Sequence, residues 1–549
     1  KQMIQYIDGK RLREMFISGA NNLQNNKELV DKLNVFPVPD GDTGTNMSLT
    51  ISYALKELAK VENDNISDIG KALSKGSLMG ARGNSGVILS QIIRGIAKSI
   101  EGKSKLSTED LAKAFKNGSD TAYKAVIKPI EGTILTVVRE SGEFAIKTAK
   151  KEKDVVKFLS MLVKESNSSL ERTPDLLKNL KEAGVVDSGG KGLVLIYEGM
   201  LASIKGDNIE IKNVDLDTNI STSMDFAKST TSTDDIKYCY CTEFILESSK
   251  VEDTKIRDIM MAYGDSLAVV GDDGVIKVHV HTNDPGNVLQ EALKYGQLLT
   301  IKIENMKLQH ENTLLDVEEK KENDSEPLEE EKEFGFIATS MGEGLANIFK
   351  DFGVDHIIEG GQTMNPSTED FMNAIKHINA KNIFIFPNNS NIIMAANQAK
   401  ELSDKNIIVI PTKNTPQGFA ALVTFNGELS EDENKEAMMN ALNSVKSGQV
   451  TFAVRDTVMN EIDVKEGNII GIAEGNLLSA GDYVDEVTSN LIEKLVDEDT
   501  AIITLFFGED VTESQANELR TSLEEKFEDV DVELYYGGQP LYYYLISVE

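Results

Sequence analysis

The chain has 549 residues, enough for three or four domains of ordinary size. It carries 57 Lys and Arg against 90 Asp and Glu, and this net charge of −33 disfavours nonspecific binding to nucleic acid or to anionic membrane surfaces. The charge is unevenly divided, because residues 1–200 hold 30 basic and 25 acidic side chains (+5) and the remainder holds 27 and 65 (−38). We therefore expect any site for a polyanionic small molecule to lie in the first 200 residues.

Other classes of protein are also disfavoured. No uninterrupted apolar run approaches the ~18 residues of a membrane span, and the first residues lack the apolar stretch and cleavage site of a secretory signal. Two cysteines, Cys239 and Cys241, cannot form a disulfide framework. We expect a cytoplasmic, multidomain protein with no integral membrane association and no nucleic-acid partner.

Residues 1–203 are predicted to form an all-α domain. Leu12, Phe16 and Leu23 recur at helical spacing, and the capping signal from Ser107 to Asp110 precedes another apolar face. The segments GVILSQIIRGIAKSI, GTILTVVRESGEFAIKTAKKE and DVVKFLSMLVKESNSSL have the same pattern.

The pattern changes after about residue 203. Residues 204–310 contain short β-type runs such as YCYCTEFIL, SLAVVG and VIKVHVHT around the helical LQEALKYG, which predicts an α+β middle domain. Residues 311–333 hold eleven acidic side chains and three lysines, a composition typical of a flexible linker. A charged surface helix is the alternative for this segment.

Residues 334–549 are predicted to form an α/β domain with a largely parallel sheet. Strand-like FGFIATS, HIIEGG, NIFIFP and NIIVIP each precede a helical segment, the pattern of crossover connections. The loops SMGEG, EGGQTMNPST, PNNSN and PTKNTPQG should then gather at the carboxyl ends of the strands, where open α/β folds bind ligands. Arg455 could meet an anion there. Ordinary turns rich in Asn, Gly and Pro are the alternative, and the tyrosines of the C-terminal LYYYLISVE suit either an interface or an edge strand.

The first chemical motif runs from Asn34 to Met47, NVFPVPDGDTGTNM. Two prolines restrict the approach to Asp40 and Asp42, and glycines let the backbone turn tightly around them. Paired carboxylates completed by phosphate oxygens and water are what Mg²⁺ prefers. A solvated turn is the alternative for Asp-Gly-Asp alone.

The second motif, MGARGNSG, spans residues 79–86 and leads directly into an apolar helix. Glycines let backbone N–H groups approach an anion, and a helix N-terminus adds unpaired donors and its positive dipole end. The motif therefore predicts phosphate binding, although it is neither a Walker loop nor a Rossmann fingerprint. A packing or capping device is the alternative.

The third motif combines YCYCTE, residues 238–243, with VHVH, residues 278–281. Alternate residues of a strand share a face, so both cysteines point one way and both histidines point one way on their own strand. On neighbouring strands these side chains could converge as zinc ligands. Buried cysteines beside ordinary strand histidines are the alternative.

The order of PDGDTGTNM, GNSG, GTIL and DSGGKG within 200 helical residues resembles the nucleotide-binding domain of dihydroxyacetone kinases. The whole chain is still more similar to the ATP-binding subunit of bacterial fatty acid kinase, which has the same three-part order. The resemblance implies an antiparallel helical barrel that holds ATP and two Mg²⁺ ions. It also implies a middle domain that binds Zn²⁺, and it suggests that the chain forms a homodimer through this domain. The C-terminal domain is implied to bind a separate fatty-acid-binding protein.

The resemblance implies a role for particular residues. Those matched to magnesium are Asp40 and Asp42, with Asn34 as a weaker candidate; those matched to ATP are Thr43, Asn46, Gly83, Asn84, Ser85, Gly86, Thr133, Asp187 and Gly189; those matched to zinc are Cys241, His279 and His281, with Cys239 as a further ligand or a bystander. The family's phosphate-binding arginine has no clear counterpart, and Arg82, Arg94 and Arg139 are the candidates.

We expect from this an ATP-dependent kinase subunit that phosphorylates the carboxylate of a carrier-bound fatty acid. The acyl phosphate and ADP would form for the incorporation of exogenous fatty acids into phospholipid. A dihydroxyacetone-type (glycerone) kinase acting on a small polyol is one alternative. A non-enzymatic scaffold that senses ATP is another.

Overall fold

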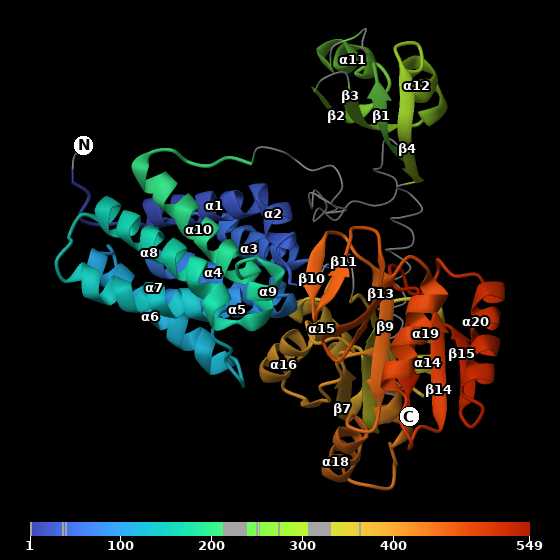
Figure 1. Ribbon diagram of the computed structural model, residues 1–549. Coiled ribbons are helices and arrows are strands. Elements are labelled where there is room, and N and C mark those ends of the chain that lie inside the picture. The colour runs from blue at the N-terminus through green and yellow to red at the C-terminus, as the bar shows by residue number, and fades with distance from the viewer. Residues whose placement is uncertain are drawn as a thin grey trace. The chain divides into compact units, whose positions relative to one another are not determined.

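The computed structural model describes residues 3–35, 38, 41–211, 239–248, 251, 253–272, 275–305, 331–361 and 364–549 (Figure 1). The chain divides into two compact units, one comprising Lys1–Val214 with Glu330–Glu549 and the other Asp215–Glu329. Asp40 and nearly all of the predicted linker lie outside the described residues. Within the described ranges, no helix combines the length and the apolar character that crossing a membrane requires.

The N-terminal part of the first unit is helical, as predicted. Its helices are α1 (Gly9–Asn25), α2 (Lys27–Asp31), α3 (Thr43–Ala59), α4 (Ile66–Gly80), α5 (Gly83–Ile100), α6 (Thr108–Ala125), α7 (Ile134–Ala149), α8 (Val155–Leu176), α9 (Lys178–Ala183) and α10 (Ser188–Lys205). Ser107 and Asp110 form the predicted capping box of α6, in which each side chain accepts a hydrogen bond from the other residue's backbone N–H.

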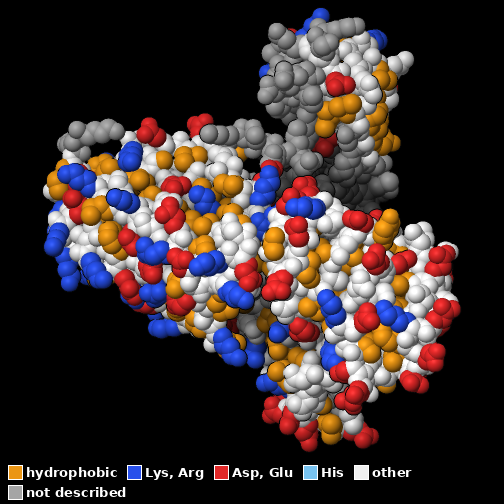
Figure 2. All heavy atoms as spheres, in the orientation of Figure 1, with side chains coloured by type: hydrophobic (Ala, Val, Ile, Leu, Met, Phe, Trp, Pro, Cys, Tyr) orange, Lys and Arg blue, Asp and Glu red, His pale blue; other side chains and the backbone are white. Residues whose placement is uncertain are grey.

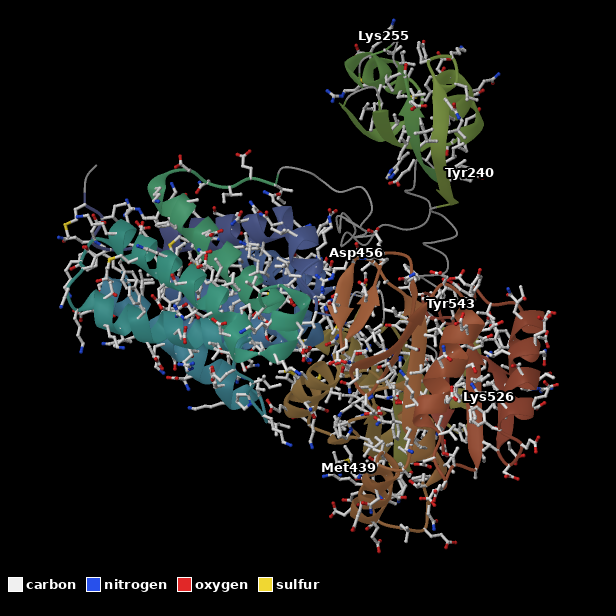
Figure 3. All side chains as sticks on the ribbon, viewed as in Figure 1. Tyr240, Lys255, Met439, Asp456, Lys526 and Tyr543 are labelled. Atoms are coloured by element: carbon white, nitrogen blue, oxygen red, sulfur yellow. The ribbon has the colours of Figure 1, made fainter. Side chains whose placement is uncertain are left out.

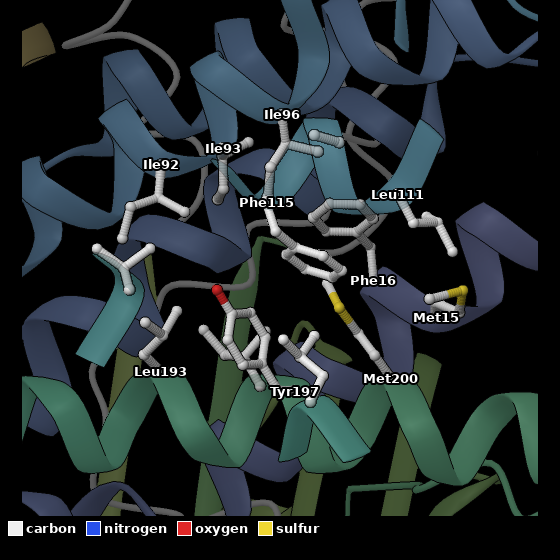
Figure 4. Packing of buried hydrophobic residues seen from close by; sticks show 14 of the residues in the cluster. Met15, Phe16, Ile92, Ile93, Ile96, Leu111, Phe115, Leu193, Tyr197 and Met200 are labelled. Carbon is white, nitrogen blue, oxygen red and sulfur yellow. The ribbon is translucent and has the colours of Figure 1, made fainter. Parts of the chain in front are cut away.

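One apolar core joins these helices. Chain neighbours from α3 to α8 pack against one another, and α10 closes the group against α1. Phe16, Phe115 and Tyr197 lie together in this core (Figure 4), where the rings of Phe115 and Tyr197 meet edge to face with centroids 5.2 Å apart. The packing leaves the polar N-termini of several helices at one end, where they form the site described below.

The second unit is an α+β domain. Its elements are β1 (Tyr240–Glu247), α11 (Asp253–Met260), β2 (Asp265–Asp272), β3 (Val275–Thr282), α12 (Pro285–Ala292) and β4 (Gln297–Asn305). The strands form an antiparallel sheet in the order β2-β3-β1-β4. Phe244, Val278 and Val280 are buried with apolar residues of α11 and α12, so the helices cover one face of the sheet.

A parallel sheet opens the C-terminal part of the first unit. Its strands are β5 (Lys332–Ser340), β6 (His356–Glu359), β7 (Ala380–Phe386) and β8 (Asn406–Val409), in the order β6-β5-β7-β8. The helices that follow them are α14 (Glu343–Asp351), α15 (Thr368–Lys376), α16 (Ile393–Leu402), α17 (Thr415–Val423) and α18 (Glu431–Ala441). The predicted alternation and strand direction are confirmed. Lys332 and Glu333, predicted as the end of the linker, already belong to β5.

A second, mixed sheet was not expected from the sequence. Its elements are β9 (Lys446–Phe452), β12 (Ile469–Ala473), β13 (Asn476–Gly481), α19 (Val484–Leu495), β14 (Ile502–Phe507), α20 (Glu513–Lys526), β15 (Asp531–Tyr536) and β16 (Tyr544–Val548), with strand order β13-β12-β9-β16-β14-β15. Because β16 lies between β9 and β14, the C-terminal tyrosine segment leads into an interior strand and not an edge strand. A small hairpin of β10 (Thr457–Met459) and β11 (Ile462–Val464) follows Asp456, labelled in Figure 3.

The surface reflects the uneven charge of the sequence. Asp and Glu side chains crowd the visible face of the C-terminal α/β part, whereas Lys and Arg are more frequent on that of the helical part (Figure 2). The helical part is therefore the electrostatically favourable place for a polyphosphate.

Candidate active site at the helix N-termini

The beginnings of α3, α5 and α10 meet at one end of the helical part. The hydroxyl oxygens of Ser188 and Thr43, which begin α10 and α3, are 3.3 Å apart. A Cβ on Gly189 would lie 3.1 Å from the hydroxyl oxygen of Ser85 in the first turn of α5. The positive dipole ends of three helices therefore share one region, an arrangement that attracts anions.

The glycines of the second motif are required by this packing. Gly83 has a φ of +62°, and a Cβ there would lie 2.4 Å from the side-chain nitrogen of the buried Asn46. A Cβ on Gly86 would lie 2.5 Å from the hydroxyl of Thr50. These two glycines therefore let the first turn of α5 pack closely against α3, the packing role that was the alternative for this motif.

Arg82 is the arginine at this loop. It precedes α5 directly, is 6% exposed and lies over the ring of Tyr53, and its Nε has no hydrogen-bond partner among the described residues. Arg139 instead binds Glu131 at 2.9 Å and Tyr123 at 3.2 Å, and Arg94 is exposed on α5. Of the three arginines between which the sequence left the choice open, Arg82 is therefore the one that lies at this loop.

Asp31, which sequence reasoning missed, caps α3. One carboxylate oxygen accepts hydrogen bonds from the N–H groups of Gly44 at 2.6 Å and Thr45 at 3.1 Å, and the other accepts from the Thr45 hydroxyl at 2.8 Å. Burial raises the pKa of Asp31 above its ordinary value. No sequence signal marks this role, because the cap comes from the end of α2 and not from the residue before α3.

Asp42 occupies the residue position before α3 but makes no side-chain cap. Its Oδ2 accepts a hydrogen bond of 2.7 Å from Nδ2 of Asn365, which lies in the loop between β6 and α15. Asn365 is fully buried, and its Oδ1 has no hydrogen-bond partner among the described residues. A carboxylate and an uncommitted amide oxygen beside a phosphate-type cradle are a donor set that fits Mg²⁺.

Asn34, the weaker magnesium candidate, has its side chain engaged at both ends. Its Oδ1 accepts a hydrogen bond of 2.7 Å from the Thr43 hydroxyl, and its Nδ2 donates to the Asp31 carbonyl at 2.7 Å. The amide holds the loop before α3 in place.

Thr133 and Asp187, matched to the nucleoside side, are helix caps. Thr133 caps α7 through the N–H of Leu135 at 3.3 Å, and Asp187 caps α10 through the N–H of Gly190 at 2.7 Å. Burial raises the pKa of Asp187 to about 6. Carboxyl groups with a raised pKa are frequent at functional sites. Here the same carboxylate also caps α10, a structural role that accounts for its position.

The C-terminal α/β part contacts the backbone on both sides of this site. The N–H of Thr368, at the start of α15, donates to the carbonyl of Ala81 at 3.0 Å. Arg455 donates to the carbonyls of Lys32 at 3.1 Å and Val35 at 2.8 Å, and also to that of Asn34. Arg455 was expected to meet an anion. In the structure its guanidinium instead donates to three backbone carbonyl oxygens of the loop between α2 and α3.

The strand-end loops of the parallel sheet gather as predicted. A cavity of about 40 Å³ is lined by residues of all four loops, including Met341, Gly361, Asn388 and Thr415. Its volume suits a few water molecules, so it does not by itself indicate a large ligand.

The predicted zinc ligands lie on one face of the middle sheet by register. Cys241 is opposite His281, and Glu243 is opposite His279, on the antiparallel pair β1 and β3. The side chains of Cys241 and His279 lie outside the described residues. Among the side chains that are described, no group of three or more His, Cys, Asp and Glu is placed to hold a metal.

The chain matches known protein families along most of its length. Residues 37–202 match the DAK2 domain, a kinase-family domain, which places the chain among kinases. Residues 237–313 match the FakA-like middle domain of fatty acid kinase, and residues 335–549 match the FakA-like C-terminal domain. The chain belongs to the family of FakA-like fatty acid kinase proteins.

Relatives of similar length match the chain from end to end. Protein YloV of Bacillus subtilis is 46% identical over 553 residues, and an uncharacterized protein of Staphylococcus aureus (strain USA300) is 45% identical over 554, each covering 100% of both chains. Among solved structures, the Streptococcus pneumoniae fatty acid kinase B3 protein loaded with linoleic acid matches 39% of this chain and 99% of its own (14% identity, TM-score 0.28). The dihydroxyacetone kinase of C. freundii matches 35% of this chain and 33% of its own (18% identity, TM-score 0.27).

Proposed function

We propose that this chain is the ATP-dependent subunit of a fatty acid kinase. It would transfer the γ-phosphoryl group of ATP to the carboxylate of a fatty acid presented by a separate carrier protein, giving an acyl phosphate and ADP for phospholipid synthesis. The observation that carries the proposal is the cradle at the start of α5, where backbone N–H groups and the buried Arg82 lie beside the helix that begins after Asp42. Family membership supports the kinase class.

The proposed roles follow from the chemistry of each residue. The backbone from Gly83 to Gly86, with Asn84 and Ser85, would bind phosphate oxygens, and Arg82 would neutralise part of their charge. Asp40 and Asp42 would hold two Mg²⁺ ions, with Thr43 and Asn46 nearby. Bound Mg²⁺ supplies charge neutralisation between the triphosphate and an anionic acceptor.

The acceptor needs no general base. An ordinary carboxyl group has a pKa near 4, so a fatty acid carboxylate already carries its nucleophilic lone pair at neutral pH. One carboxylate oxygen forms a bond to the γ-phosphorus while the bond from that phosphorus to the β–γ bridging oxygen breaks, and ADP leaves with that electron pair. The protein positions the two anions and shields their repulsion.

The nucleoside would lie against the beginnings of α7 and α10. Thr133, Asp187 and Gly189 are the residues proposed there. Gly189 packs closely against Ser85 and Ile134, so a side chain there would crowd the point where α5, α7 and α10 meet.

The experiment that tests the proposal supplies Mg²⁺ and ATP with either a carrier-bound fatty acid or dihydroxyacetone. ADP and acyl phosphate should form only with the fatty acid. Turnover with dihydroxyacetone alone would favour a polyol kinase, and ATP binding without turnover would favour a sensing scaffold.

Asp42→Ala should abolish turnover, by a factor of at least about 10³, because the carboxylate that would hold the metal is removed. Since Asp31 and not Asp42 caps α3, the variant should stay folded in the absence of Mg²⁺ and lose only about 1–3 kcal/mol for the hydrogen bond from Asn365. Steady-state ADP release and urea unfolding measure the two effects. Normal turnover by an Asp40→Ala, Asp42→Ala double variant would refute the assignment.

We also propose that Cys241, His279 and His281 hold a structural or regulatory Zn²⁺ ion in a middle domain that forms a homodimer. The register that brings these three positions to one sheet face supports this, since sulfur and imidazole are ligands zinc prefers. One zinc per chain should appear in the purified protein by elemental analysis and fall in Cys241→Ser. An unchanged zinc content in that variant would sink the assignment.

The C-terminal α/β domain is the proposed docking site of the carrier, and the cytoplasm is the proposed compartment. Both proposals rest on family membership. Because the same domain also contacts the loop before α3 and the start of α5, carrier docking there would place the acceptor close to the ATP site.

A further inference from the structure

Asn365, in the C-terminal α/β part, donates a hydrogen bond from its side chain to the carboxylate of Asp42. More than 300 residues of chain separate the two, and they lie in segments that match different domain families. We infer that the side-chain oxygen of Asn365 is a ligand of the Mg²⁺ bound at Asp42, supplied by the C-terminal domain to the kinase site. The inference rests on the proposed function, because that function places Mg²⁺ at Asp42.

The first argument is the uncommitted oxygen. Asn365 is 0% exposed, and its Oδ1 has no hydrogen-bond partner among the described residues. Leaving a buried polar atom unpaired costs about 1–3 kcal/mol, so such atoms in a folded protein call for a specific cause. The orientation of the amide in this structure thus leaves its oxygen unused, and a cation at Asp42 would favour the orientation in which that oxygen faces the carboxylate, since carbonyl oxygens are hard ligands.

The second argument is distance. The Nδ2 of Asn365 lies 2.7 Å from Oδ2 of Asp42. The two ends of a side-chain amide exchange places by a half-turn about the last torsion angle. Neighbouring oxygens around Mg²⁺ with bonds of about 2.1 Å at right angles are about 3.0 Å apart. The half-turn therefore brings the amide oxygen to a separation from Asp42 that suits two ligands of one ion.

The third argument is the anchoring of the loop that carries Asn365. Gly360 and Gly361 have φ values of +148° and +142°, which let the chain turn away from the end of β6. Three residues after Asn365, the N–H of Thr368 donates to the carbonyl of Ala81. The Nε2 of Gln398 donates to the hydroxyl of Thr368 at 3.0 Å and so braces the same segment. The amide is therefore presented to Asp42 by backbone that is anchored on its C-terminal side.

The test measures Mn²⁺ binding to the full-length chain with a non-hydrolysable ATP analogue, by electron paramagnetic resonance of free Mn²⁺. Asn365→Ala should weaken Mn²⁺ binding at least about tenfold, because a ligand is lost. Asn365→Asp should bind Mn²⁺ as tightly as the wild type or more tightly, because it keeps an oxygen at the same position and adds a charge. These readouts do not depend on turnover.

The alanine variant is compared with a variant that loosens the same domain contact without touching Asp42. If Asn365→Ala weakens Mn²⁺ binding no more than that control, the inference is overturned. Wild-type affinity in Asn365→Ala overturns it as well. Asn391→Ala is the matched control for loosening of the domain contact, because Asn391 accepts a hydrogen bond of 3.3 Å from Asn84 and also belongs to the α/β part.

Failure of the proposed function gives a different result. A wild-type chain that binds no Mn²⁺ with the ATP analogue contradicts both the function and the inference, whereas normal wild-type binding with an indifferent Asn365→Ala contradicts the inference alone. Far-ultraviolet circular dichroism and urea unfolding without metal confirm that each variant is folded. In that metal-free state Asn365→Asp should be the least stable variant, because its carboxylate faces that of Asp42.

Discussion

Asp31 and Asp42, the two described aspartates near the start of α3, have different hydrogen-bond partners. Asp31 satisfies the N–H groups of Gly44 and Thr45, so the first turn of α3 does not need Asp42 as a cap. The first N–H groups of a helix lack partners inside the helix, so a nearby carboxylate commonly accepts hydrogen bonds from them. Asp42, the residue directly before α3, instead accepts the hydrogen bond from Asn365.

Asp187→Asn should stabilise the protein at neutral pH. An asparagine caps a helix about as well as an aspartate, and it avoids burying a charge. The pKa of Asp187 is raised from 3.8 to about 6 in the folded chain. A difference of about 2 pKa units corresponds to at most about 3 kcal/mol, reduced by roughly 0.3–1 kcal/mol for the lost interaction with the dipole of α10.

The sign of this effect sets its pH window. Below the unfolded value of 3.8 the carboxyl is protonated in both states, and the wild type bears no cost. As pH rises from 3.8 to about 6, the unfolded chain releases its proton first, so the wild type loses stability relative to the asparagine variant. Urea unfolding at several pH values measures the difference. A gain that is as large at pH 4 as at pH 7 would contradict charge burial as its cause.

The start of α5 should tolerate no side chain at Gly83. Gly83→Ala introduces a Cβ 2.4 Å from Asn46 at a φ of +62°, so we expect a loss of about 2 kcal/mol or more of unfolding free energy together with weaker binding of the ATP analogue. Gly102→Ala is the matched control, because Gly102 has a φ of +76° but no atom within 4 Å of its Cβ position. The control should lose only the backbone strain of about 1–2 kcal/mol.

Isothermal titration with the ATP analogue and thermal unfolding distinguish the two glycine variants. Both should unfold more easily than the wild type, but only Gly83→Ala should bind the nucleotide more weakly. Equal nucleotide affinity in the two variants would show that the start of α5 does not bind phosphate.

Local sequence patterns predicted most of the elements, for reasons visible in particular residues. The Ser107 capping box, the apolar spacing around Phe16 and the strand–helix alternation after β5 are signals contained in a few neighbouring residues. The mixed sheet was missed because its central strands β9, β16 and β14 come from separate parts of residues 446–548. Their short apolar runs give no indication of which strands pair.

At the scale of the molecule, the site depends on contacts that no local pattern contains. The motifs around Asp42 and Gly83 were recognisable because glycines and carboxylates have distinctive chemistry. The contribution of Asn365 was not, because it depends on how the α/β part packs against the helical part. The loop EGGQTMNPST was noted as a ligand-type loop, but its partner is a residue more than 300 positions away.

Arg455 should couple the stability of the α/β part to the proposed metal loop, the segment between α2 and α3 that leads to Asp42. Its guanidinium donates to the carbonyls of Lys32, Asn34 and Val35, and the hairpin that follows it packs with Val35 and Val38 in one apolar cluster. Arg455→Met removes three charge-assisted donors but keeps an apolar stem of similar length. The metal loop would then lose its attachment, and Asp42 would no longer be held opposite Asn365.

We expect Arg455→Met to lower the unfolding free energy by about 1–3 kcal/mol and to weaken Mn²⁺ binding. Hydrogen–deuterium exchange should become faster at residues 32–35, because the carbonyls that anchor the loop are released to water. Arg520→Met is the control, since Arg520 forms an ion pair with the exposed Glu524 one turn away in α20, and such a surface pair contributes little. Unchanged exchange at residues 32–35 in Arg455→Met, with Mn²⁺ affinity equal to that of Arg520→Met, would mean that the α/β part does not hold the metal loop.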